Sequence, residues 1–144
     1  MPKQLKLVLL FTAVSFILFT GFKKANPISS SKGHPVGPVT ITAVYDFSTF
    51  PNVSGTFTTG GALTISGTTT MDINLNGNGI RGHCVVVLTA PNGTITIHQE
   101  CTFGPPIPKG QWQIVGGTGA YANLRGNGSL LMPPNTEAME GTIY

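Results

Sequence analysis

Few ionisable side chains are available for acid–base chemistry once the N-terminal region is set aside. From Asn26 onward the sequence has four cations and five anions. The cations are Lys32, Arg81, Lys109 and Arg125, and the anions are Asp46, Asp72, Glu100, Glu137 and Glu140. Glu100 and Arg125 are the first candidates for a catalytic role, because each borders an otherwise apolar stretch. They belong to no recognisable catalytic spacing, and no serine lies in the elbow motif of the Ser-His-Asp hydrolases.

The histidines and cysteines do not suggest a metal site. His34 lies in a polar segment ahead of the domain, and the neighbours His83 and Cys84 point to opposite faces if they belong to a strand. His83 and His98 share a face of the expected hairpin, but they lie far apart along it and have no third ligand. Zinc needs at least three protein ligands, so we expect no metal and no cofactor.

The net charge of +3 does not describe the part of the chain expected to fold. Half of the eight cations lie in the first 24 residues, as Lys3, Lys6, Lys23 and Lys24. The remainder is near neutral at −1, and its cations are scattered along the sequence. Nucleic acids and anionic lipids bind to concentrated positive surfaces. The composition therefore argues against a nucleic-acid partner and against a membrane partner beyond the N-terminal segment, and it leaves the oligomeric state open.

A glycine-rich segment, Val115-Gly-Gly-Thr-Gly-Ala-Tyr121, looks at first like a phosphate-binding turn. A dinucleotide-binding fold needs a following helix, a second parallel strand and an acidic residue about 20 positions further on. Only 25 residues follow Gly119, and glycines and prolines interrupt them. We therefore expect Gly116, Gly117 and Gly119 to be structural, because a tight turn with positive φ favours glycine.

The longer stretch Trp112-Gln-Ile-Val-Gly-Gly-Thr-Gly-Ala-Tyr-Ala-Asn-Leu-Arg-Gly-Asn-Gly-Ser-Leu130, with Glu140-Gly-Thr-Ile-Tyr144 after it, resembles the C-terminal part of allene oxide cyclase barrel-like and dirigent-like proteins. The shared pattern is a strand that runs into Gly-Gly-Thr-Gly, an aromatic residue, a small turn and a glycine-containing strand. The resemblance implies an antiparallel barrel of about eight strands around an internal cavity. In that superfamily the glycines form a structural turn, so the resemblance carries a fold and not a chemistry to this chain.

The N-terminal region is typical of a secretory signal peptide. Lys3 and Lys6 precede an apolar run over residues 7–22. We expect residues 1–25 to be removed on export to a secreted or periplasmic location, with an uncleaved membrane anchor as the alternative, because Lys23 matches the cleavage pattern poorly. Residues 26–38 are expected to form a flexible tether to a single domain at residues 39–144.

The domain has the pattern of an all-β protein, rich in Thr, Val and Ile and interrupted by Gly, Asn and Pro about every 8 to 12 residues. The expected strands cover residues 39–47, 54–59, 62–66, 68–75, 79–89, 94–103, 111–115, 124–131 and 138–144. Short turns favour antiparallel neighbours, and about eight strands can hide their edges by closing into a small barrel. A β-sandwich is the alternative. The large aromatics Tyr45, Phe103, Trp112 and Tyr121 are expected to fill the core or cap the barrel ends.

The clearest local prediction is a hairpin over residues 83–102 with Asn92 and Gly93 at its turn. That register places Cys84 opposite Cys101 on a nearly apolar face, where an oxidising compartment would favour a disulfide. A type I turn followed by a bulge at Gly93 is the alternative, and it would separate the two cysteines.

Three functional hypotheses remain. The first is an exported barrel that is non-catalytic or binds a small hydrophobic ligand in its cavity. The second is a cyclase or isomerase-type enzyme that acts on a hydrophobic intermediate, and the third is a surface adhesion or structural module. An inward-facing ionisable residue with a strongly shifted pKa would favour the enzyme, whereas a wholly apolar lumen would favour binding or plain packing. Because ionisable groups are so few, we expect any functional site to lie inside the barrel or at its mouth, and to bind a ligand rather than catalyse a reaction.

Overall fold

The computed structural model describes residues 35–144, so the expected signal peptide, most of the tether and His34 lie outside the described residues. Eight strands and two short 3-10 helices follow one another along residues 35–144. The strands are β1 Gly37–Asp46, β2 Asn52–Gly61, β3 Ser66–Leu75, β4 Arg81–Ala90, β5 Gly93–Thr102, β6 Lys109–Gly117, β7 Gly126–Leu131 and β8 Thr136–Ile143, and the helices are η1 Phe47–Thr49 and η2 Gly119–Tyr121.

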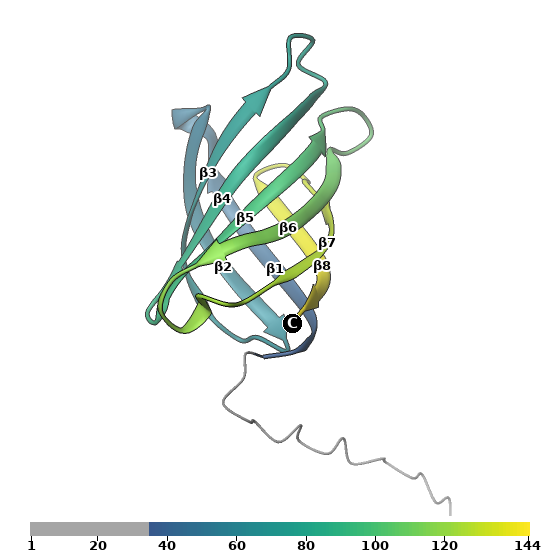
Figure 1. Ribbon diagram of the computed structural model, residues 1–144. Coiled ribbons are helices and arrows are strands. Elements are labelled where there is room, and N and C mark those ends of the chain that lie inside the picture. Colours follow the sequence, from purple (N-terminus) through teal and green to yellow (C-terminus); the bar gives the residue numbers. More distant parts are fainter. Residues whose placement is uncertain (1–34) are drawn as a thin grey trace, which may run out of the picture.

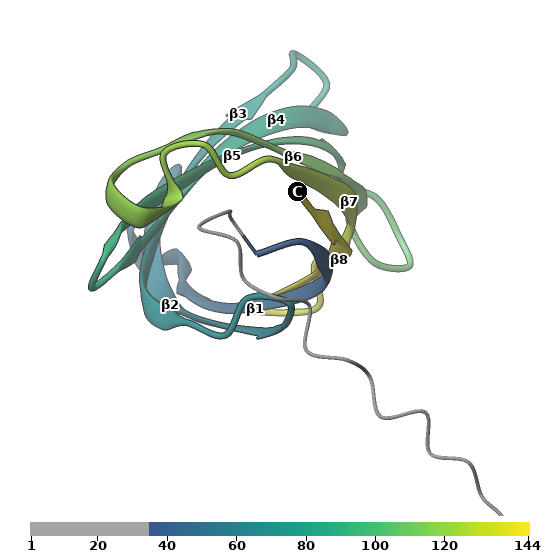
Figure 2. The same cartoon turned by 60° about the horizontal axis from the view of Figure 1, so that its bottom comes forward.

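The strands form a closed barrel in which they follow their order in the sequence (Figures 1 and 2). Each strand is antiparallel to its neighbours, and β1 closes the barrel by pairing with β8 from Gly37 opposite Ile143 to Val44 opposite Thr136. Closure leaves no unpaired sheet edge along these strands. The all-β class and the small antiparallel barrel are confirmed, and the alternative β-sandwich is not formed.

Alternation of buried and exposed residues, most regular in β1, gives each strand one inner and one outer face. In β1 the side chains of Val39, Ile41, Ala43 and Tyr45 are buried, and the residues between them are exposed. Successive side chains of a strand point to opposite faces of the sheet, so the apolar side chains of each strand share one face. That face is stabilised when it packs against the apolar faces of the other strands. The inner sets of the eight strands meet in a single hydrophobic core.

The largest core side chain, Trp112 of β6, fits because glycines lie beside it. Trp112 pairs with Gly128 of β7, which in turn pairs with Gly141 of β8. A Cβ atom at Gly141 would collide with the indole ring. The indole nitrogen donates to the carbonyl oxygens of Ser129 at 3.1 Å and Glu140 at 3.2 Å. The glycine-containing strand of the sequence motif thus makes room for the tryptophan.

The expected separate strand at residues 62–66 is wrong, because residues 62–65 form the connection between β2 and β3 and Ser66 begins β3. The Thr59 hydroxyl donates to the Leu63 carbonyl oxygen at 2.7 Å and accepts a hydrogen bond from the Ile65 backbone N–H at 2.9 Å. These bonds fold the segment back on β2, and the Leu63 side chain is buried. The apolar residues that suggested a strand instead cover one end of the barrel.

The β4–β5 hairpin keeps its predicted faces but not its predicted register. Cys84 lies opposite Gln99, and Cys101 lies opposite Gly82, so the direct pairing of the two cysteines is wrong. Because the register differs by an even number of residues, both cysteines still point into the barrel, where they are buried. They are free thiols in the structure.

The turn of this hairpin is Pro91-Asn92 rather than Asn92-Gly93, because Gly93 already pairs with Ala90 in the ladder. A tertiary contact explains the difference from the expected turn. The backbone of Gly93 packs so closely against the carbonyl of Thr118 that a Cβ atom would not fit. The hairpin turn thus packs against the loop between β6 and β7, and this contact requires a glycine at position 93.

Candidate functional site

The two ends of the barrel differ. At the end that we call the closed end, the β2–β3 connection and η2 with the residues after it bury Leu63, Tyr121 and Leu124. At the opposite end, the open end, a pocket of about 200 Å³ enters the barrel beside η1 and the β7–β8 turn. Figure 1 shows the β3–β4 hairpin extending beyond this open end, whereas the C-terminus lies at the closed end.

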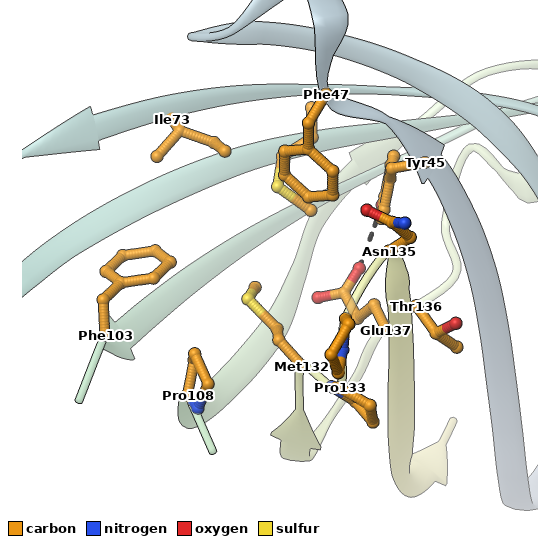
Figure 3. Close-up of a pocket in the computed structure, with 12 residues that line it drawn as sticks. Tyr45, Phe47, Ile73, Phe103, Pro108, Met132, Pro133, Asn135, Thr136 and Glu137 are labelled. Carbon is orange, nitrogen blue, oxygen red and sulfur yellow. Dashed lines mark hydrogen bonds between the residues drawn. The ribbon is translucent and has the colours of Figure 1, made fainter. Parts of the chain in front are cut away.

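The walls of the open-end pocket are mainly apolar, and its inner part is polar. The apolar side chains come from η1, β3, the β5–β6 loop and the β7–β8 turn. They are Phe47, Met71, Ile73, Phe103, Pro108 and Met132, with Pro133 and Pro134 at the turn. Tyr45 and Glu137 provide polar atoms on the inner side, as Figure 3 shows. The prediction that Tyr45 and Phe103 fill the core or cap an end agrees with these positions.

A hydrogen-bonded cluster at Glu137 spans the lumen behind the pocket. The Tyr45 hydroxyl of β1 donates to Oε2 of Glu137 at 2.9 Å (Figure 3). The Gln99 amide nitrogen of β5 donates to Oε1 of the same carboxyl group at 2.6 Å. Because β5 and β8 are not neighbours in the barrel, this second bond crosses the interior. One carboxyl group therefore joins three strands from the inside.

The strand pattern explains why Glu137 points inward. Glu137 alternates with the buried side chains of Met139 and Ile143 along β8, with Gly141 between them on the same face. Directly opposite Glu137 on β1 is Ala43, whose small side chain leaves space for the carboxyl group. Tyr45 follows Ala43 on the inner face of β1. The same alternation that builds the core thus places a carboxyl group and a phenol side by side.

Burial changes the acid–base properties of this cluster. Glu137 is 1% exposed, and its burial raises its pKa from 4.5 to about 7, although the hydrogen bonds from Tyr45 and Gln99 favour the charged form. Burial, together with the nearby charge of Glu137, also raises the pKa of Tyr45. Near neutral pH the lumen therefore holds one carboxyl group that gains and loses a proton and one phenol that stays neutral.

The two buried thiols lie next to the same cluster. Cys101 approaches Oε1 of Gln99, with its sulfur at 4.0 Å. A hydrogen bond with Cys101, followed in importance by burial, raises the pKa of Cys84. A thiol that resists ionisation is a poor nucleophile, so the raised pKa of Cys84 does not favour it as a catalytic nucleophile.

The candidates named from the sequence do not line the pocket. Glu100 is exposed on the outer face of β5. Arg125 is exposed at the closed end, where its guanidinium donates to the Leu124 carbonyl oxygen at 2.9 Å. Neither residue lies at the open-end pocket, so their catalytic role stays a prediction that this site does not support. The buried carboxyl group is Glu137, which the sequence analysis counted only as one of the anions.

The signal that would have found Glu137 was its alternation with Met139. The predicted last strand began at residue 138, two positions too late, so Glu137 fell outside it. Once β8 begins at Thr136, period-two alternation places Glu137 on the same face as the core residues. An error of two residues at a strand end thus concealed the candidate site.

The glycines of the sequence motif have different surroundings. Gly116 and Gly117 belong to β6, and Gly119 opens η2 with a φ of +59°. A Cβ atom at Gly119 would collide with the Asn92 carbonyl, whereas the space beside Gly116 is open. A structural need for glycine is therefore clear at Gly119, and the structure gives no such reason at Gly116.

The histidines lie away from the pocket. His83 and His98 are exposed on the outer face of the β4–β5 hairpin. Within residues 35–144, no group of three or more His, Cys, Asp or Glu side chains is placed to hold a metal ion. The arrangement at the open end can instead bind a ligand or exchange a proton through Glu137.

Comparison of the chain with known protein families, with curated proteins and with solved structures finds no match. The resemblance to allene oxide cyclase barrel-like and dirigent-like proteins stays a prediction, since a closed barrel does not identify a superfamily. In the part of the chain that the structure describes, no helix is long and apolar enough to cross a membrane. Function must therefore be argued from the open-end pocket itself.

Proposed function

We propose that the barrel binds a small, largely apolar molecule in the open-end pocket, with Glu137 as its polar anchor. The observation that carries the proposal is the combination of apolar walls with one buried carboxyl group at the inner side. Ligand sites commonly have this composition, in which apolar walls provide affinity and a few polar groups fix orientation.

The size of the pocket limits the ligand. Its volume of about 200 Å³ is close to that of an apolar cavity that holds benzene. Pockets for drug-sized molecules are larger, at about 300–1,000 Å³. The ligand is therefore a single-ring molecule or the end of a longer chain that extends out of the mouth.

The rim of the open end suits the entry of such a ligand. Phe50 of the β1–β2 connection, Ile80 of the β3–β4 turn and Ile107 of the β5–β6 loop are exposed there. Exposed apolar residues that gather around a concave site are a usual mark of binding. These side chains offer an apolar molecule contacts near the mouth, although the exposed Asp46, Arg81 and Lys109 lie at the same end of the barrel.

We further propose that the protein is exported from the cytoplasm after its signal peptide is cleaved. It would then be an exported member of the allene oxide cyclase barrel-like and dirigent-like superfamily that the sequence motif resembles. The apolar run between lysine pairs supports export. Export would expose Cys84 and Cys101 to oxidation, and both thiols lie on the inner face of one hairpin. We therefore also propose a disulfide between Cys84 and Cys101 in the exported protein.

The proposed site can be tested by filling the pocket mouth. Met132 lines the pocket, whereas the adjacent Leu131 points outward and is 50% exposed. In the full chain, Met132→Trp should reduce the binding of benzyl alcohol at least about tenfold, and Leu131→Trp should leave it unchanged. Ligand-detected NMR measures both affinities, and mass spectrometry of molecules extracted from the purified protein identifies a natural ligand. Equal binding by the two variants would contradict the proposed site.

A second candidate function is acid–base catalysis by Glu137 on a hydrophobic substrate. The observation that favours it is that burial raises the pKa of Glu137 to about 7, beside the phenol of Tyr45. A general acid or base works best when its pKa lies near the working pH. A cyclase or isomerase of this kind would lose turnover in Glu137→Gln while still binding its substrate. Retained turnover in that variant would contradict the enzyme.

A further inference from the structure

We infer that the open-end pocket selects small molecules that carry a protonated primary amine on a compact apolar body. This inference rests on the proposed binding function and names the chemical class of its ligand. It depends on the position of the Glu137 carboxyl group, which lines an apolar pocket and has only neutral hydrogen-bond partners.

The first argument is that no cation within residues 35–144 balances the charge of Glu137. Its hydrogen-bond donors are the Tyr45 phenol and the Gln99 amide, and both are uncharged. The cations within residues 35–144 are Arg81, Lys109 and Arg125, and all three are exposed. A buried charge without a partner is costly, so a ligand that brings the opposite charge removes this cost.

The hydrogen-bond pattern gives the second argument, because it fits the ionised form of Glu137. Each carboxyl oxygen already accepts a hydrogen bond, Oε2 from Tyr45 and Oε1 from Gln99. A proton on either oxygen needs an acceptor. Among the lining side chains besides Tyr45, only Asn135 and Thr136 carry an acceptor oxygen, and neither is hydrogen-bonded to Glu137. An ammonium group supplies donors only, so it matches the free acceptor capacity of the carboxylate.

Other titratable groups around Glu137 do not replace the ligand charge. Tyr45 faces it from β1 and Cys84 from β4, and Cys101 of β5 contacts its partner Gln99. Burial raises the pKa of Tyr45, and a hydrogen bond with Cys101 raises that of Cys84, so both stay neutral near neutral pH. Met139, the next inward residue of β8, carries no charge. Glu137 is thus the group whose charge an incoming ammonium group would meet.

The walls of the pocket supply the third argument. Phe47 packs edge-on against Tyr45, with ring centroids 6.0 Å apart, and Phe103 lies on another wall (Figure 3). Aromatic faces attract cations, and the thioethers of Met71 and Met132 adapt to an apolar body. An anionic ligand, in contrast, would place its charge beside the carboxylate. The surroundings therefore favour an arylalkylamine or a short alkylamine over a carboxylic acid of the same shape.

The test compares three probes of one shape, benzylamine, benzyl alcohol and benzoate, by calorimetric titration of the full chain. At about pH 8, where Glu137 is mostly ionised, benzylamine should bind at least about tenfold more tightly than benzyl alcohol. Benzoate should bind most weakly. The advantage of benzylamine should shrink at about pH 6, where Glu137 is mostly protonated.

Matched variants assign this preference to one carboxyl group. Glu137→Gln should bind benzylamine and benzyl alcohol equally, whereas Glu140→Gln, which changes an exposed position on the same strand, should keep the preference. If Glu137→Gln does not fold, the pH dependence of the unmodified chain still decides. Equal affinities for benzylamine and benzyl alcohol at the higher pH would overturn the amine inference and leave the proposed function intact. Absence of binding by all three probes would overturn both.

Discussion

The closed end and the open end of this barrel are built on different principles. At the closed end, backbone groups from distant segments contact one another, as when the Ala120 N–H donates to the Asn92 carbonyl oxygen at 2.9 Å. Side chains such as Leu124 fill the remaining space and are fully buried. At the open end, apolar side chains line a pocket instead of filling it, and the one buried carboxyl group lies behind them.

On the proposed function, this difference separates the part of the barrel that provides stability from the part that binds the ligand. The closed end and the central core bury enough apolar surface to hold the barrel together. The open end can then carry an incompletely filled space and a carboxyl group that is costly to ionise. Functional sites often keep such unfavourable features, which the remainder of the fold compensates.

The largest expected effect comes from creating a cavity at the closed end. Leu124→Ala removes a fully buried side chain and should lower the free energy of unfolding by about 2–5 kcal/mol. Met132→Ala at the open-end pocket, where the side chain is only partly buried, should cost less than about 1 kcal/mol. Chemical denaturation of both variants measures the difference. Similar losses of unfolding free energy in the two variants would contradict the proposed difference in packing between the closed end and the open end.

The charge of Glu137 should make stability depend on pH. Burial raises its pKa in the folded protein from 4.5 to about 7, so between these values the folded state binds more protons than the unfolded state. The free energy of unfolding should therefore be highest below the lower value and fall by about 3 kcal/mol as the pH rises through the higher one. Glu137→Gln should remove this decrease, and Glu140→Gln should keep it. Denaturation curves at several pH values provide the comparison.

A disulfide between Cys84 and Cys101 should form in exported protein and stabilise the middle of the barrel by up to about 3 kcal/mol. The gain should be smaller than this limit, because the two residues already belong to one hairpin. Mass spectrometry under non-reducing conditions should show the loss of two hydrogens. Two free thiols in the mature protein would contradict the bond.

A smaller effect is expected at the glycines of the closed end. Gly119 has a φ of +59° and contacts the Asn92 carbonyl, so Gly119→Ala should destabilise the domain by about 1 kcal/mol or more. Gly116→Ala is the matched control, because nothing lies close to the position of its Cβ atom. Thermal unfolding of the two variants should separate them. Equal stability would indicate that the turn does not need a glycine.

The barrel could be predicted from the sequence because period-two alternation and frequent turn residues leave few other arrangements. The hairpin register could not, since the close contact of Gly93 with Thr118 joins segments that no local pattern relates. The strand expected at residues 62–66 failed for a similar reason, because Thr59 folds those residues back on β2. Local rules therefore predicted the elements and the buried faces, and tertiary contacts decided the details.

The candidate site was harder to predict than the fold. Glu100 and Arg125 border apolar stretches, but their strand positions turn them outward. Glu137 was concealed by a strand boundary placed two residues too late. Its partner Gln99 lies across the lumen on β5, a proximity that appears only when the sheet closes. Glu137 and Tyr45 lie inside the barrel, where a site was expected, whereas Glu100 and Arg125 are exposed.

The most direct test of the account is an NMR titration of the Glu137 carboxyl group in protein with isotopically labelled glutamate side chains. Without ligand its pKa should be about 7, because the group is buried behind the open-end pocket. Saturating benzylamine should lower this pKa by at least about one unit, because an ammonium group favours the ionised form. Exposed Glu140 serves as the internal control and should not respond to the amine. A pKa near the ordinary value of about 4.3 that benzylamine leaves unchanged would contradict the account.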